Sequence, residues 1–208
     1  MNQPVKQNSE FIAHHGFRAR ARDLVRDGAV FALSLGKSIN STSGWIRFPY
    51  YHHVFDDERA GFSRQLDYLK QHGDFISLSN AVSLLESGAT IDGRFFCITF
   101  DDGFKNNLTN AVPILLDKKA PAAFFLTTDY IGLDVDVDQQ RLLDFYDHRQ
   151  TLMEFLNWDD CKKMIAAGME IGSHTMGHTQ LSGLQEDDVR QQLAASKKVI
   201  ESNLDQRC

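Results

Sequence analysis

Short apolar runs alternate with longer amphipathic stretches along most of this chain. Continuous apolar or β-branched runs of roughly four to eight residues are typical of strands buried in a parallel sheet. We expect such strands near residues 45–52, 74–78, 95–100, 122–127 and 169–173, and helices, from apolar positions at helical spacing, near 58–72, 79–87, 107–118, 140–156, 158–167 and 185–204. The alternation predicts an α/β fold with a mostly parallel sheet and right-handed crossovers, a barrel or part of one.

The first part of the chain does not follow this alternation. Residues 1–44 read as an N-terminal extension and linker, in which residues 10–26 favour a helix and residues 36–44 form a Ser-rich connection. The arginine-rich run at 18–22 is typical of a solvated helix face. We therefore expect a helical extension, followed by one α/β domain over residues 45–208.

Two adjacent acids end the most apolar of the predicted strands. Residues 95–100 are followed directly by Asp101, Asp102 and Gly103. Neighbouring residues of a strand point to opposite faces, but a strand end turned by a glycine allows both carboxylates to reach one cavity. One carboxylate could then bind a metal and the other a proton. The alternative interpretation is an ordinary turn, for which Asp and Gly are common residues.

Two histidines spaced four apart follow the last predicted strand. His174 and His178 could point at one position from a single helical turn or from a tight loop. Two neutral imidazoles and one carboxylate leave coordination positions open, as in a catalytic zinc site. Alone, such histidines are more often surface or core residues. Both motifs lie at carboxyl ends of predicted strands, where barrel active sites are built, and together they predict a metal-dependent hydrolase.

These motifs resemble those of the polysaccharide deacetylase family, the NodB-homology domain of carbohydrate esterases. The resemblance spans roughly residues 45–205. It is carried by residues 99–103 (Thr-Phe-Asp-Asp-Gly), 174–178 (His-Thr-Met-Gly-His), 51–54 (Tyr-His-His-Val), 121–126 (Pro-Ala-Ala-Phe-Phe-Leu), and Trp158 ahead of residues 168–174. It implies a partial (β/α) barrel of the NodB deacetylase type.

The resemblance also implies roles for individual residues. Asp102, His174 and His178 would hold a divalent metal, most commonly Zn²⁺, and Asp101 would be the general base. The activity implied is removal of acetyl groups from N-acetylated or O-acetylated sugars or polysaccharide, a hydrolysis of carbon–nitrogen bonds other than peptide bonds in the amide case. No further cofactor is implied.

The chain departs from the family pattern after the second histidine. The later family motifs supply an Arg that orients the base, an aromatic wall for the acetate pocket and a His that protonates the leaving group. Residues 47–50 (Arg-Phe-Pro-Tyr) resemble one of them, but we interpret them as part of the first strand. We therefore expect the C-terminal part of the barrel to be missing, or to be completed by a partner. The alternative function is a non-catalytic or incomplete metal-binding fragment.

Composition excludes several other classes of protein. The chain carries a net charge of −6 and shows no clustered basic stripe, which argues against binding of nucleic acid. No segment approaches the length of a membrane span, so we expect no transmembrane segment. Its 3 cysteines have no metal-binding spacing, and we expect a cytoplasmic location and a buried Cys97.

Overall fold

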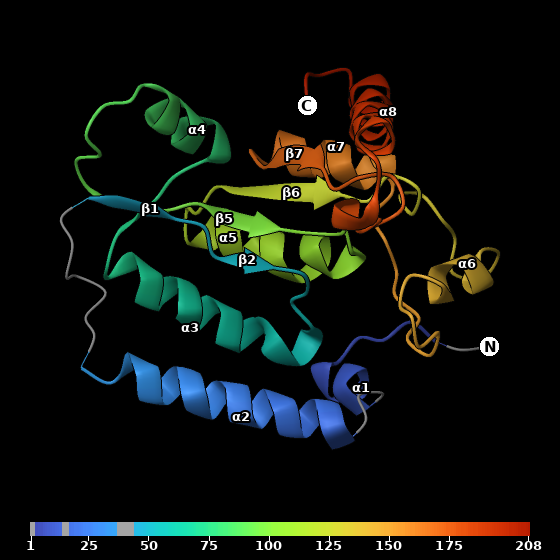
Figure 1. Cartoon of the computed structure of the whole chain (residues 1–208), viewed down its shortest axis with the longest axis horizontal. Helices are drawn as coiled ribbons and strands as arrows, with labels where there is room; N and C mark the ends of the chain where they lie inside the picture. Colours follow the sequence, from blue (N-terminus) through green and yellow to red (C-terminus); the bar gives the residue numbers. More distant parts are fainter. Residues whose placement is uncertain (1–2, 14–16, 37–43) are drawn as a thin grey trace.

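Figure 1 shows the computed structural model of the chain, which describes residues 3–13, 17–36 and 44–208. Its strands are β1 (Trp45–Arg47), β2 (Tyr50–Tyr51), β3 (Asp74–Phe75), β4 (Arg94–Phe96), β5 (Ile98–Phe100), β6 (Ala122–Leu126) and β7 (Glu170–Ser173). Its helices are α1 (Asn8–Ala13), α2 (Phe17–Ser34), η1 (Asp56–Glu58), α3 (Arg59–Lys70), α4 (Leu78–Glu86), η2 (Asn107–Ala111), α5 (Val112–Asp117), α6 (Gln139–Leu143), α7 (Trp158–Ala166), η3 (Leu181–Gly183) and α8 (Glu186–Leu204).

The strands pair in parallel, in the orders β1-β4-β3 and β2-β5-β6-β7. β1 and β2 form one strand interrupted at Phe48 and Pro49, and β4 and β5 form another. The pairing keeps one register across the interruption, because the N–H of Cys97 donates to the carbonyl of Arg47 (2.9 Å) and the N–H of Thr99 donates to that of Pro49 (3.1 Å). Proline is tolerated here because this strand has a partner on one side only.

The predicted fold class is confirmed, since parallel strands alternate with helices. Within residues 44–208, β2 and β7 each pair on one side, so the barrel is not closed. The boundary near residue 44 and the completion of the barrel by a partner or a further segment stay predictions. Among the described residues, no helix is both long and apolar enough to cross a bilayer.

All five predicted strands are present, and the predicted helices are found with one exception. A helix over residues 140–156 was wrong, because α6 ends at Leu143. The chain then turns through Arg149, which has φ 53°, and Phe155 forms an isolated antiparallel bridge to Phe104. Burial explains the difference, since the apolar residues of this segment face a shared cluster rather than one side of a helix: Leu142, Phe145, Leu152, Met153 and Phe155, around Phe104.

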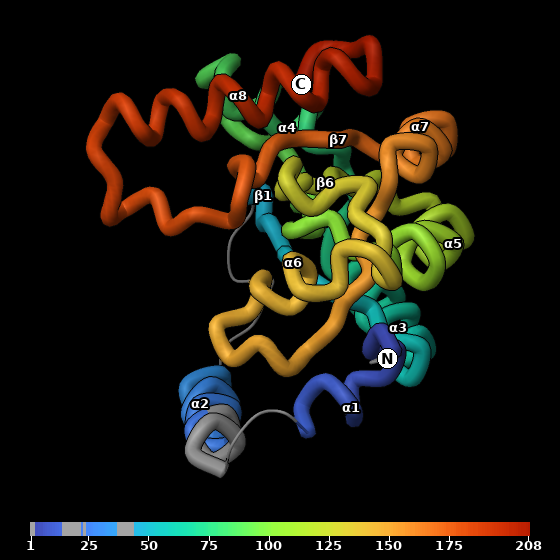
Figure 2. The backbone as a smooth tube through the Cα atoms, turned by 90° about the vertical axis from the view of Figure 1, so that its right-hand side faces the viewer, coloured from blue at the N-terminus to red at the C-terminus, as the bar shows by residue number. Residues whose placement is uncertain are grey.

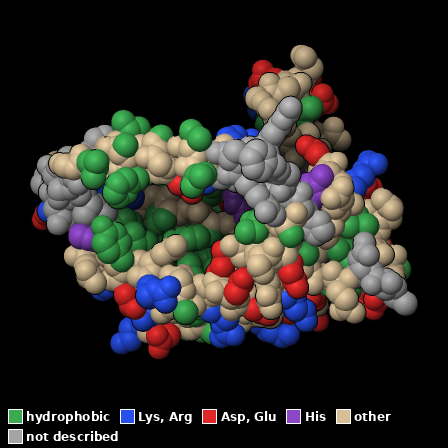
Figure 3. Space-filling view, turned by 90° about the horizontal axis from the view of Figure 1, so that it is seen from below, with side chains coloured by type: hydrophobic (Ala, Val, Ile, Leu, Met, Phe, Trp, Pro, Cys, Tyr) green, Lys and Arg blue, Asp and Glu red, His purple; other side chains and the backbone are tan. Residues whose placement is uncertain are grey.

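The N-terminal extension is helical, as predicted, and forms α1 and α2. His14 and His15, which their polar, arginine-rich surroundings predict to be solvated, lie outside the described residues, as does most of the predicted linker at 36–44. α8 and α2 lie at opposite ends of the molecule (Figures 1 and 2). Apolar side chains spread over the underside seen in Figure 3, and along α2 and just after it several are exposed: Leu24, Val25, Val30, Phe31, Leu33 and Leu35.

A row of stacked side chains crosses the sheet just before the strands end. Tyr51, Phe100, Phe124 and Ile171 are register partners on β2, β5, β6 and β7. The rings of Phe100 and Phe124 stack at 4.7 Å and 12°, and that of Tyr51 lies 5.3 Å from Phe100. Phe100 and Phe124 are fully buried. Because close packing fixes these positions, the row holds the strand ends that follow it in fixed relative places.

The start of α7 is fixed by a buried ion pair. Asn157 Oδ1 accepts the N–H of Asp160 (2.8 Å), and Asp160 Oδ2 accepts the N–H of Asn157 (3.1 Å) and a hydrogen bond from Lys105 Nζ (2.5 Å). The Asp160 side chain is 3% exposed. Burial acts to raise the pKa of Asp160, but the hydrogen bonds from Lys105 and Asn157 lower it overall.

We expect Asp160→Asn to destabilise the protein by about 1–3 kcal/mol at pH 7, the cost of leaving a buried charged partner unsatisfied. Because the folded-state pKa lies below the unfolded value, this stabilisation is present above about pH 4 and is lost as the pH falls through the folded pKa. Urea unfolding at pH 7 and at about pH 3 measures the difference. The exposed Asp159→Asn is the control, and an equal loss at both pH values for Asp160→Asn would contradict the assignment to charge.

Candidate metal centre and active site

Four residues singled out from the sequence lie at one edge of the sheet. Asp101 and Asp102 follow β5, and His174 follows β7. β6 lies between these strands and joins them at their ends, because the carbonyl of Leu126 accepts the N–H of His174 (2.9 Å). Carboxyl ends of parallel strands meet at the same edge, which brings Asp102 and His174, 72 positions apart, into one site.

Both loops that carry these residues bend through left-handed backbone conformations. Asp102 has φ 73°, and Gly103 follows with φ 85°. The positive φ favours glycine at this position, and a Cβ atom there would also crowd Ile131 Cδ1 at 2.9 Å and Leu126 Cδ2 at 3.0 Å. The histidine segment is a tight loop rather than a helical turn, with φ 66° at Thr175 and φ 56° at His178. Such strained non-glycine residues cluster at functional sites.

The three expected metal ligands come together. Asp102 Oδ1 lies 3.5 Å from His174 Nε2 and 3.4 Å from His178 Nε2, and one ligand atom from each residue lies within 4.8 Å of the others. Asp102 is buried, and its Oδ1 atom has no hydrogen-bond partner. A buried carboxylate oxygen without a partner, facing two imidazoles, fits a cation, because burying an uncompensated charge is costly.

The electrostatics of the group agree with this fit. Burial raises the pKa of Asp102 to about 6, with His52 and His174 acting to lower it and Asp101 to raise it. Burial and His52 lower the pKa of His178. His178 is therefore neutral near pH 7, the form of imidazole that binds metals. A bound cation would stabilise the Asp102 carboxylate that burial disfavours.

The histidine loop is held by contacts to its neighbours. The Thr175 side chain is buried, and its Oγ1 accepts the N–H of Thr179 (3.3 Å). The carbonyl of Thr175 accepts the N–H of Thr128, which follows β6 (3.3 Å). Gln192 on α8 accepts the N–H of Met176 (3.2 Å). Thr175 thus closes the loop between the two histidines and starts no helix.

Asp101 lies beside the triad without belonging to it. Its N–H donates to the carbonyl of Tyr51 (2.9 Å), which fixes its backbone against β2. Its carboxylate acts on the pKa of both Asp102 and His178 and is partly exposed. Asp101 is therefore a second carboxylate next to the triad, as the sequence predicted, and remains accessible to a water or a substrate.

The sequence analysis did not identify two residues that neighbour the site. His52 follows β2 at the same sheet edge, and its charge acts on Asp102 and His178. Its place at the end of the predicted strand near residues 45–52 was a signal for it. Phe145 stacks on the ring of His178, with centroids 4.7 Å apart and an interplanar angle of 20°. Nothing in the sequence indicated this contact, because the pattern placed Phe145 in a helix.

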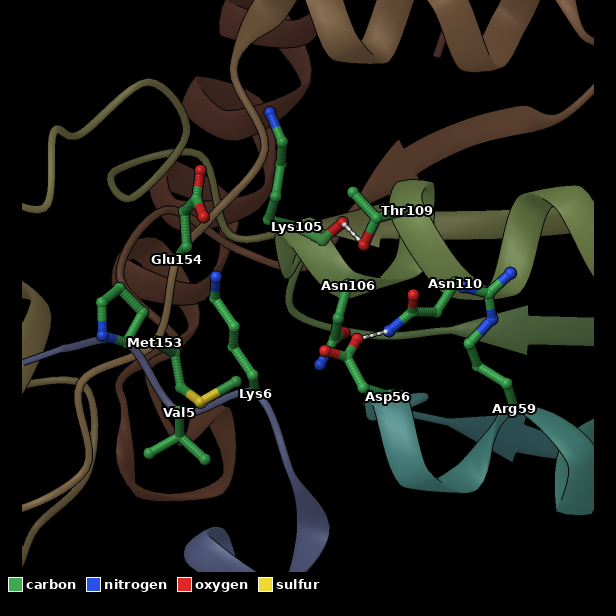
Figure 4. Close-up of a pocket in the computed structure, with 11 residues that line it drawn as sticks. Val5, Lys6, Asp56, Arg59, Lys105, Asn106, Thr109, Asn110, Met153 and Glu154 are labelled. Atoms are coloured by element: carbon green, nitrogen blue, oxygen red, sulfur yellow. Dashed lines mark hydrogen bonds between the residues drawn. The ribbon is translucent and has the colours of Figure 1, made fainter.

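A cavity of about 420 Å³ opens next to the histidines. Both imidazoles line it, with Thr179, Leu181 and Leu193 among the remaining walls. A separate pocket of about 360 Å³, drawn in Figure 4, lies between the N-terminal segment, the start of α3 and η2. None of the four predicted site residues lines that second pocket. The cavity at the histidines is lined by two of the four predicted site residues, His174 and His178, and not by Asp101 or Asp102.

Comparison with known proteins identifies the family. The family model for polysaccharide deacetylase matches residues 89–208, which include both motifs of the site. This chain belongs to the polysaccharide deacetylase family. The resemblance inferred from the sequence is thereby confirmed.

Individual relatives agree with this membership. YxkH of Bacillus subtilis (strain 168), a polysaccharide deacetylase by name, is 24% identical over 190 residues, covering 85% of this chain and 61% of that protein. The chain thus spans about three fifths of the length of this curated relative. Among solved structures, IcaB from Ammonifex degensii has a TM-score of 0.65 at 22% identity, covering 80% of this chain and 72% of that one.

The Streptococcus pyogenes deacetylase PplD, solved in complex with acetate, has a TM-score of 0.58 at 21% identity, covering 80% of this chain and 71% of that one. At these identities the likeness concerns the fold. The parallel sheet and its helices are therefore arranged as in these two solved structures.

Proposed function

We propose that this chain binds a divalent cation through Asp102, His174 and His178 and removes acetyl groups from N-acetylated or O-acetylated sugars. One observation carries the proposal: the unpartnered, buried Asp102 Oδ1 faces two imidazole nitrogens at 3.4–3.5 Å, in a chain of the polysaccharide deacetylase family. Two imidazoles and a carboxylate match the ligands that zinc takes in catalytic sites with an open position.

A bound divalent cation would polarise the acyl carbonyl and make a water more acidic. Asp101 accepts the proton of the attacking water, whose oxygen forms a bond to the acyl carbon. The bond from that carbon to the sugar nitrogen or oxygen then breaks, and the proton passes to the leaving atom. The products are acetate and a free amine or hydroxyl. Asp101 suits this role because it neighbours the triad and is partly exposed.

The cavity beside the triad supports a substrate of this kind. Apolar side chains of Leu181 and Leu193 lie beside the polar groups of Thr179 and Gln180 and the two histidines. Mostly apolar walls with a few placed polar groups are typical of small-molecule sites, and a sugar ring with an acetyl group presents both kinds of surface.

A zinc titration followed by acetate release tests the proposal. We expect calorimetry to show one zinc bound per chain, and acetate release from an N-acetylated glucosamine oligomer or an O-acetylated xylose oligomer to stop with a chelator and return with zinc. Zinc binding without acetate release from either oligomer would favour the non-catalytic metal-binding alternative. Absence of zinc binding by the folded chain would contradict the proposal as a whole.

A further inference from the structure

A line of three partly buried polar side chains ends next to the candidate site. Asn106, the N-cap residue of η2, places its Nδ2 atom 3.4 Å from His53 Nδ1. His53, in the loop after β2, places its Nε2 atom 3.0 Å from the hydroxyl of Tyr146. Three segments that are distant in the sequence thus meet in one series of hydrogen bonds. None of the three metal-ligand candidates takes part in these hydrogen bonds.

The chemistry of these groups fixes the direction of the hydrogen bonds. An amide nitrogen only donates, so His53 Nδ1 accepts from Asn106. A neutral imidazole that accepts at Nδ1 carries its proton on Nε2 and donates it to the Tyr146 oxygen. The hydroxyl proton of Tyr146 is then not used in the hydrogen bond to His53 and can be donated to another acceptor.

The surroundings of His53 keep it neutral and in place. Its ring packs on that of Phe104, with centroids 4.1 Å apart, and on that of Phe55, at 4.8 Å. Burial and the neighbouring His52 lower the pKa of His53 to about 3. Asn106 is held at the wall of the pocket in Figure 4. The donor on Nε2 is therefore present throughout the physiological pH range.

Tyr146 lies against the candidate site. The preceding residue, Phe145, stacks on the metal-ligand candidate His178. The Tyr146 ring is parallel to that of Phe104, two residues after Asp102, with centroids 6.4 Å apart and an angle of 8°. Burial and the charge of Asp102 raise the pKa of Tyr146, so the phenol keeps its proton. The Tyr146 hydroxyl is thus a neutral donor that is held by His53, and the residue before it packs on the triad.

We propose that the Tyr146 hydroxyl donates a hydrogen bond to the acyl oxygen of a substrate at the triad, and that His53 and Asn106 are positioning residues for this donor. This rests on the proposed function. Donors that are already oriented toward a developing negative charge lower the reaction barrier, because no reorganisation is needed during the reaction. Tyr146 would be such a donor, and the partly buried His53 and Asn106 would supply its orientation.

Kinetics of paired variants measure this role. Tyr146→Phe removes only the hydroxyl, and we expect kcat to fall about 10²-fold with KM changed less than about threefold. Tyr130→Phe is the matched control, because Tyr130 packs on Phe155 in the same aromatic cluster and takes no part in this chain of hydrogen bonds. Its kcat should stay unchanged. An unchanged kcat in Tyr146→Phe would overturn the proposal.

Variants of His53 separate positioning from structural support. His53→Phe keeps a stacked ring but cannot donate, whereas His53→Gln can accept from Asn106 and donate to Tyr146. We expect His53→Phe to lower kcat, His53→Gln to recover most of the loss, and His53→Phe combined with Tyr146→Phe to be no slower than Tyr146→Phe alone. Losses that multiply in the double variant would overturn the positioning role.

Two measurements do not depend on turnover. Nitrogen NMR of histidine-labelled wild type should find the His53 proton on Nε2. A proton on Nδ1 would overturn the assigned direction of the hydrogen bonds from Asn106 to Tyr146. Acetate should bind the zinc-loaded wild type about tenfold more tightly than Tyr146→Phe, and equal affinities would overturn the contact. If the wild type binds zinc and releases no acetate, the proposed function fails, and these two measurements still decide the role of Tyr146.

Discussion

Replacing Asp102 with Asn should reduce zinc affinity by more than about 10²-fold and abolish acetate release. Loss of residues that only support metal ligands already costs 10–100-fold in metal affinity, and Asp102 supplies the one carboxylate of the triad. Asn is the suitable replacement because it tolerates left-handed backbone, and Asp102 has φ 73°. Ala at this position would add backbone strain to the loss of the ligand.

The measurement is a calorimetric zinc titration of the wild type and Asp102→Asn side by side. Asp129→Asn is the control, because Asp129 lies in the neighbouring loop, with Oδ2 3.5 Å from where a Cβ of Gly177 would lie, and stays outside the triad. The control should bind zinc as the wild type does. Circular dichroism shows whether each variant is folded. Undiminished zinc binding by a folded Asp102→Asn would contradict the triad.

Asp101→Asn should keep zinc and lose turnover. Removal of a general base costs about 10²–10⁴-fold in rate. Because Asp101 supplies none of the three ligand atoms, zinc binding should persist, with a modest loss from the missing negative charge beside Asp102 and His178. The two adjacent carboxylates would then have different functions: Asp102 would bind the metal, and Asp101 would accept the proton of the water.

Acetate release and zinc titration are needed on the same preparation of Asp101→Asn. Retention of full turnover would show that another group takes the proton of the water. Loss of zinc binding would show that Asp101 and Asp102 act together as ligands. Either result would change the assignment within the site and leave the membership of the family intact.

Much of the site could be predicted because it depends on local sequence. Apolar runs that stop at Asp101 and before His174 mark strand ends, and parallel strands place their carboxyl ends at one edge. The row of Tyr51, Phe100, Phe124 and Ile171 shows why this inference holds, because tight packing across the sheet fixes the position from which each loop begins.

The segment after α6 could not be predicted, because its apolar residues are placed by a distant partner. Leu152, Met153 and Phe155 pack around Phe104, about fifty residues earlier, and the antiparallel bridge to Phe104 exists only in the folded chain. The spacing of apolar residues indicates that a segment is buried, but it does not indicate which part of the fold that segment packs against.

By itself, the sequence determined the parallel α/β fold, the strand ends, the family and the four candidate site residues, because these follow from periodicity and from short contiguous motifs. Only the tertiary structure decided which neighbours surround them. It placed Phe145 on His178, Tyr146 on His53, and His52 within reach of Asp102. These contacts join segments far apart in the chain, and their geometry depends on how the loops between the strands pack together.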